Sequence, residues 1–117
     1  MSEPKITKVI NDSGEISDEL DYALSKFLLS ERGAGFTACQ PKLVELEGGT
    51  QAIKMGIDHT FFGKDGNIYG LGIVGYIYIA TTDFSVLYCS PLEELEENIE
   101  VFRESGIKPQ ARPKGKY

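Results

Sequence analysis

The sequence predicts an α+β domain: an antiparallel, curved sheet of four to five strands, packed on one face by two helices. Two amphipathic segments with capping signals flank a region of period-two patterns and turn residues, and the length of 117 residues is typical of a single domain. The expected order is β-α-β-β-β-β-α, and the central strands form a meander. Residues 1–107 are predicted to form the domain, and the basic, proline-containing residues 108–117 a flexible tail.

The first two elements are predicted to be a short strand and a helix. Lys5 to Ile10 is rich in β-branched residues and is followed by turn formers, which predicts an edge strand. Ser17 is a typical N-cap before acidic residues, and Gly33 has the place of a C′ glycine, so we predict a helix over residues 18–32. The apolar residues at helical spacing are Leu20, Ala23, Leu24, Phe27 and Leu28.

The next two strands are predicted on either side of a glycine pair. Phe36 to Leu46 contains Pro41, which cannot donate to a ladder, so this strand is expected at a sheet edge or broken by a bulge. Gly48 and Gly49 are typical of a two-residue hairpin turn. Apolar and polar residues alternate in Gln51 to Phe62, which predicts a strand buried on one face only.

The uncharged stretch Asn67 to Thr82 is predicted to be the central strand. With regular alternation, the row facing the helices is Tyr69, Leu71, Ile73, Ile77 and Ile79. The opposite row, called here the Gly/Tyr face, contains Gly70, Gly72, Val74, Tyr76 and Tyr78. A glycine inside a strand costs roughly 0.5–1 kcal/mol relative to alanine. We therefore expect a bend here, or close approach by a ligand or by another copy of the chain.

The same stretch contains a G-x-G-x-x-G pattern at Gly70, Gly72 and Gly75. A dinucleotide-binding turn would need a helix to start there, but the residues that follow are aromatic and β-branched and favour a strand. The position where such a fold places its ribose-binding carboxylate falls near Cys89 and Ser90. We therefore reject this interpretation and expect no cofactor.

A fourth strand of the meander and a second helix complete the prediction. Phe84 to Cys89 has strand character. Ser90, Pro91 and Glu93 have the spacing of an N-cap, a first-turn proline and a capping box, and Gly106 is expected to end the helix.

Composition limits the classes of partner. The hydrophobic fraction of 41% and the charged fraction of 26% are ordinary for a globular protein. The N-terminus does not resemble a signal peptide, and no uncharged run reaches the roughly 18 residues of a membrane span, so we expect a cytoplasmic protein without a membrane partner. Cys39 and Cys89 are fifty residues apart, and we expect free thiols and no metal site.

The charge is unevenly distributed along the chain. Residues 1–107 have a balance of -10 and residues 108–117 a balance of +4, which gives the net charge of -6. An acidic body repels phosphate backbones, so a nucleic acid is not the expected partner except through the basic tail.

Asp58, His59 and Asp83 are the candidate polar site residues, and no residue is assigned a catalytic role. Neighbours on a strand point to opposite faces, so Asp58 is not expected to orient His59 as a dyad. The familiar catalytic motifs are missing from the sequence, which favours a protein that is not an enzyme.

Two functional hypotheses follow from these patterns. The first is a small binding or regulatory protein that forms a homodimer through an open Gly/Tyr face, because that strand has few polar side chains on either face. The alternative is a protein, or a small enzyme, that binds a nucleotide or metabolite on the same face.

Overall fold

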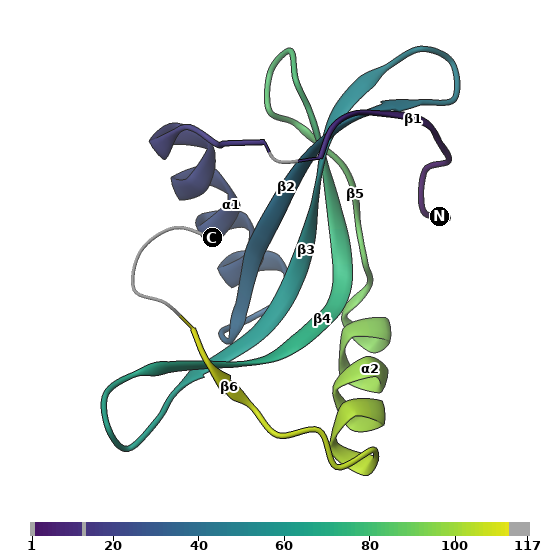
Figure 1. Ribbon diagram of the computed structural model, residues 1–117. Coiled ribbons are helices and arrows are strands. Elements are labelled where there is room, and N and C mark those ends of the chain that lie inside the picture. The colour runs from purple at the N-terminus through teal and green to yellow at the C-terminus, as the bar shows by residue number, and fades with distance from the viewer. Residues whose placement is uncertain (1, 13, 113–117) are drawn as a thin grey trace.

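The computed structural model describes residues 2–12 and 14–112 and has the predicted α+β architecture (Figure 1). The strands are β1 (Ile6–Asn11), β2 (Phe36–Leu46), β3 (Gln51–Phe62), β4 (Ile68–Ala80), β5 (Val86–Cys89) and β6 (Gln110–Ala111); the helices are α1 (Asp18–Glu31) and α2 (Leu92–Glu104). The antiparallel sheet runs in the order β1-β2-β3-β4-β5, which is the expected meander, and β6 pairs with β4.

Both helices pack on the same face of the sheet, as the sequence predicted. Leu20, Leu24 and Leu28 of α1 share one core with Leu95 and Ile99 of α2. The sheet contributes Met55, Ile57, Leu71, Val74, Ile77 and Ile79 to this core. The leucines of α1 recur every four residues, so a single stripe of the helix meets the sheet.

A second, smaller core lies on the opposite face of the sheet, near β1. It consists of Val44, Leu46, Ala52, Tyr78 and Tyr88. Ala52 is fully buried, and Asp58 and Thr60, polar residues of β3 that alternation places opposite its apolar row, are buried as well. The prediction that β3 is buried on one face only was therefore wrong. Curvature of the sheet brings residues of β1, β2 and β5 over the face that the helices leave open.

Three register shifts interrupt the pairing of the long strands. Gln40 has φ 55 next to the shift between Cys39 and Lys42, so β2 contains the bulge that Pro41 suggested and is not an edge strand. In β4, Ile57 pairs with Gly75, Asp58 with Ile73 and Thr60 with Gly70, so β4 carries one extra residue at each of two shifts.

The predicted alternation does not hold next to the first of the two shifts in β4. Val74 is only 1% exposed and lies in the core with the helices, whereas Ile73 lies against Gly56. The predicted assignment of these two residues was wrong, because the extra residue displaces the alternation locally. Ile77 and Ile79 lie in the helix-facing core as predicted.

The two helices start differently. The Ser17 hydroxyl accepts a hydrogen bond from the Leu20 amide at 3.2 Å, which confirms the predicted N-cap of α1. The N-cap of α2 is Pro91, with no side-chain cap, and the predicted capping box was wrong. Ser90 is instead fully buried, and its hydroxyl accepts a hydrogen bond from the Tyr76 amide of β4 at 2.9 Å.

The chain returns to the sheet after α2. Gln110 and Ala111 pair with Gly70 and Tyr69, and the Arg112 amide donates to the Ile68 carbonyl at 2.8 Å. The first part of the predicted tail thus forms a strand at the lower end of β4 (Figure 1). Residues 113–117 of that tail lie outside the described residues, and the domain boundary at residue 107 stays a prediction.

Candidate functional site

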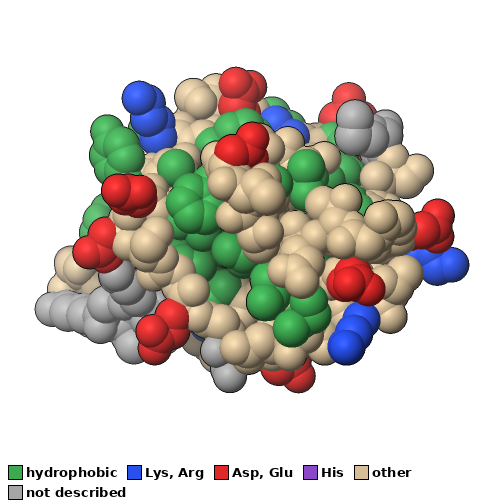
Figure 2. Space-filling model, turned by 90° about the horizontal axis from the view of Figure 1, so that it is seen from above, with side chains coloured by type: hydrophobic (Ala, Val, Ile, Leu, Met, Phe, Trp, Pro, Cys, Tyr) green, Lys and Arg blue, Asp and Glu red, His purple; other side chains and the backbone are tan. Residues whose placement is uncertain are grey.

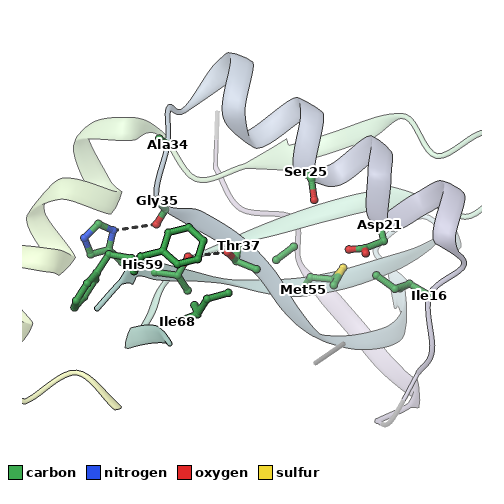
Figure 3. A pocket seen from close by; sticks show the side chains of 13 residues that line it. Ile16, Asp21, Ser25, Ala34, Gly35, Thr37, Met55, His59 and Ile68 are labelled. Carbon is green, nitrogen blue, oxygen red and sulfur yellow. Dashed lines mark hydrogen bonds between the residues drawn. The ribbon is translucent and has the colours of Figure 1, made fainter. Parts of the chain in front are cut away.

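A groove of about 770 Å³ lies between α1 and the part of the sheet formed by β2 and β3 (Figure 3). Its apolar lining includes Ile16, Ala38, Met55, Phe61, Phe62 and Ile68. Its polar side chains are Asp21, Ser25, Thr37, His59 and Thr60. A volume of this size, with mainly apolar walls and a few convergent polar groups, is typical of sites for small molecules.

The position of α1 explains the polar groups on one wall. The stripe of Leu20, Leu24 and Leu28 points into the core, so Asp21 and Ser25, one position further on, lie on the flank of the helix. Figure 3 shows both side chains directed from α1 toward the sheet, above Met55 and Thr37. Among the described residues, Asp21 takes part in none of the side-chain hydrogen bonds or ion pairs.

His59 closes one end of the groove in a fixed orientation. Its Nδ1 lies 3.0 Å from the Gly35 carbonyl oxygen, which also accepts a hydrogen bond from the Thr60 amide at 2.8 Å. A carbonyl oxygen only accepts, so we infer that Nδ1 carries the proton and that Nε2 of the neutral ring is an acceptor. The ring centroid lies 5.6 Å from that of Phe36 and 6.3 Å from that of Phe61.

The rim of the groove is an exposed apolar patch next to the turn of the β3–β4 hairpin. Phe62 is 78% exposed, and Phe61 and Ile68 are exposed to a lesser degree. Beneath them the Thr37 and Thr60 hydroxyls share a hydrogen bond of 2.8 Å (Figure 3). Exposed aromatic side chains beside an apolar groove offer a ligand additional surface.

Asp58 lies outside the groove, in a buried ion pair. Its carboxylate accepts hydrogen bonds from Arg112 Nε at 2.8 Å and from the Gly72 amide at 3.0 Å. The Asp58 side chain is 2% exposed and the Arg112 side chain 23%. Asp58 and His59 thus have different partners, as the alternation of a strand predicted, and they form no dyad.

Cys39 lies close to this ion pair and has little nucleophilic character. Burial raises the pKa of its thiol to about 11, and the nearby Asp58 carboxylate adds to the increase. The thiolate is the reactive form, so this cysteine is inert near neutral pH. Cys89 is also a free thiol, and burial raises its pKa as well.

Close packing within the chain accounts for the glycines of the G-x-G-x-x-G pattern. A Cβ at Gly70 would collide with Arg112 Nε and Asp58 Oδ2, and a Cβ at Gly75 would collide with Leu95 and Ser90. Gly72 has φ +137 and donates its amide to Asp58. These close approaches involve the protein itself rather than a ligand.

The other residues of the Gly/Tyr face differ widely in exposure. Val74 and Tyr78 are buried, whereas Tyr76 is 37% exposed, with Lys54 Nζ 4.2 Å from its ring centroid. The Tyr78 hydroxyl donates a hydrogen bond to Glu3 at 2.6 Å. Burial and this hydrogen bond raise the Tyr78 pKa well above its usual range. Within the described residues, Tyr76 is therefore the tyrosine that this face presents to solvent.

Asp83 also lies apart from the groove. It is exposed in the turn between β4 and β5, where its carboxylate accepts a hydrogen bond from the Ser85 amide at 3.0 Å. Hydrogen bonding by Ser85 lowers the Asp83 pKa, as is typical of an Asp that stabilises its own turn. Of the three predicted polar residues, only His59 lines the groove.

Sequence reasoning missed most of the groove. The available signals were the pair Asp21 and Ser25, one turn apart beside the leucine stripe, and the consecutive Phe61 and Phe62 before a turn. Two adjacent phenylalanines on a strand cannot both face the same core.

Within residues 2–12 and 14–112 no cluster of His, Cys, Asp and Glu is suited to a metal ion, and no helix has the length and apolar character of a membrane span. Comparison with family models, curated proteins and solved structures finds no match for the chain.

Proposed function

We propose that the protein binds a small, largely apolar molecule in the groove between α1 and the sheet. The observation that carries this proposal is the groove itself, about 770 Å³ in volume, with apolar walls and a few polar side chains. A site that already exists in the free protein needs little reorganisation to bind, which favours affinity. The proposed site differs from the small-molecule site expected from the sequence, because it does not lie on the Gly/Tyr face. It does include His59, one of the predicted polar residues.

The lining supports binding more than chemistry. The apolar walls supply the hydrophobic contribution, at roughly 25 cal/mol per Å² of apolar surface removed from water. His59 Nε2, the two threonine hydroxyls and the α1 side chains supply the polar contacts that orient a ligand. The groove lining contains neither cysteine, so it offers no thiol nucleophile.

Self-association as a homodimer stays a prediction. Tyr76 is the residue of the Gly/Tyr face that remains available to a partner, since Val74 and Tyr78 are buried in the chain's own cores. The patch of Phe61, Phe62 and Ile68 at the groove rim is a second apolar surface that a partner could cover.

A substitution that fills the groove tests the proposal. Ser25→Phe places a ring between α1 and the sheet, and we expect it to weaken binding of the neutral fluorophore N-phenyl-1-naphthylamine about tenfold or more, a loss of at least about 1.4 kcal/mol. The measurement is a fluorescence titration, which is simplified because the chain has no tryptophan.

The matched control is Ser30→Phe. Ser30 is exposed on the same helix but is not part of the groove lining, so this variant introduces the same ring without filling the site. We expect it to bind the fluorophore like the wild type. Equal binding by both variants, with unchanged melting curves, would show that the fluorophore binds elsewhere.

A further inference from the structure

The charges around the groove indicate what kind of apolar molecule it accepts. Asp21 and His59 are the ionisable side chains in its lining, and no lysine, arginine or glutamate contributes to the lining among the described residues. An anionic ligand would therefore meet a carboxylate without a compensating cation. A cationic ligand would find in Asp21 a carboxylate that no side chain of residues 2–12 and 14–112 pairs with.

The helix terminus does not cancel this negative charge. The first turns of α1 carry Asp18, Glu19 and Asp21, whereas a helix N-terminus contributes only about half of a positive charge. The chain as a whole has a net charge of -6. On the face shown in Figure 2, acidic side chains, with basic ones between them, lie around a central group of hydrophobic side chains. A cation is thus attracted both at long range and at the groove.

The hydrogen-bonding groups of the groove also suit a donor. The carboxylate of Asp21 and Nε2 of His59 are acceptors, and the Ser25 hydroxyl lies one helical turn from Asp21 (Figure 3). A protonated amine is a donor only, so its ammonium group can donate to Asp21, while His59 lies at the other end of the groove (Figure 3). The aromatic rings of Phe61 and Phe62 at the rim suit an aromatic or long aliphatic body.

We propose that the ligand is an amphiphilic amine, with an apolar body in the groove and its ammonium group paired with Asp21. This inference rests on the proposed function and specifies its ligand class. It predicts that, among ligands of the same size and shape, the positively charged one binds most tightly.

Three ligands that share one ring system separate charge from hydrophobicity: 2-naphthylmethylamine, 2-naphthylmethanol and 2-naphthoate. By calorimetry or thermal shift we expect the amine to bind the wild type at least about tenfold more tightly than the alcohol, and the carboxylate to bind most weakly. Asp21→Asn should remove the tenfold preference for the amine over the alcohol.

The control is Glu19→Gln, which removes one negative charge from the same helical turn at an exposed side chain outside the lining. It should keep the preference for the amine. If alcohol and amine bind equally and Asp21→Asn changes neither, the amine inference is wrong while groove binding stands. If none of the three ligands binds, or Ser25→Phe binds all three like the wild type, the proposed groove function itself is wrong.

Discussion

Replacing Arg112 with methionine is expected to lower the free energy of unfolding by about 3 kcal/mol. The substitution keeps a long apolar side chain but removes the guanidinium that donates to Asp58 at 2.8 Å. The Asp58 carboxylate, 2% exposed, would then be a buried charge whose remaining hydrogen bond comes from the Gly72 amide. Breaking one side of a buried pair costs more than the pair contributes, because the other charge is left without compensation.

A double-mutant cycle measures the interaction energy between Arg112 and Asp58 separately from the other contacts of Arg112. Asp58→Asn removes the charge but keeps an oxygen that can accept from the Gly72 amide. In the Arg112→Met background, we expect Asp58→Asn to recover part of the lost stability, measured by urea unfolding. A loss below 1 kcal/mol for Arg112→Met, or additive effects in the cycle, would contradict a structural role for this ion pair.

Replacing Gly75 with alanine is expected to cost about 2 to 3 kcal/mol. The added methyl group would overlap Leu95 of α2 and lie 2.8 Å from both Cβ and Oγ of Ser90. Ser90 has little freedom to move, because its backbone and hydroxyl are hydrogen-bonded to Tyr76 and its carbonyl accepts from Arg32 Nε at 2.8 Å. Helix α2 must therefore shift away from β4.

Two further substitutions separate the effect of the close contact at Gly75 from the effect of backbone strain. Gly48 has φ +94 and open space around its Cβ position, so alanine there costs only the conformational term, about 1 kcal/mol. Leu95→Ala removes the side chain that meets the new methyl, so the two core substitutions together should cost less than the sum of their separate effects. A Gly75→Ala protein as stable as the wild type would show that α2 lies further from β4 than described.

The order and type of the elements were predictable because local signals agreed with each other. Ser17 caps α1, and Gly48 and Gly49 lie in the turn between β2 and β3, where both have positive φ. That turn is one residue longer than the predicted two-residue turn, because Glu45 pairs with Gln51 and the Leu46 amide donates to the Thr50 carbonyl. The leucine stripe of α1 was readable at a period of 3.6 residues, and strand alternation at a period of two. Such signals depend on neighbouring residues, so no knowledge of distant contacts was needed.

The bulge of β4 next to Ile73 and Val74 could not be predicted from the sequence. Ile73 and Val74 are both aliphatic and β-branched, so either of them satisfies a core position, and the pattern fits both registers equally well. Strand β6 was hidden for a different reason. It has only two residues, and the interaction of Arg112 with Asp58 spans 54 positions of the chain.

The groove was hidden because segments that are far apart in the sequence form it. Asp21 and Ser25 come from α1, Thr37 from β2, and His59 from β3, and none of them belongs to a local motif. The sequence instead suggested a binding surface at the glycines of β4. Those glycines are required by the chain's own packing, so they do not indicate a ligand site.

The most direct test of groove binding is a ¹H–¹⁵N correlation spectrum recorded while N-phenyl-1-naphthylamine is added. We expect saturable shifts of the backbone amides of Ser25, Thr37, His59 and Thr60, which surround the groove. The amide of Val44, in the core on the other face of the sheet, should not move. Shifts centred on that second core or on Tyr76, with the groove amides unchanged, would contradict the proposal that the groove is the binding site.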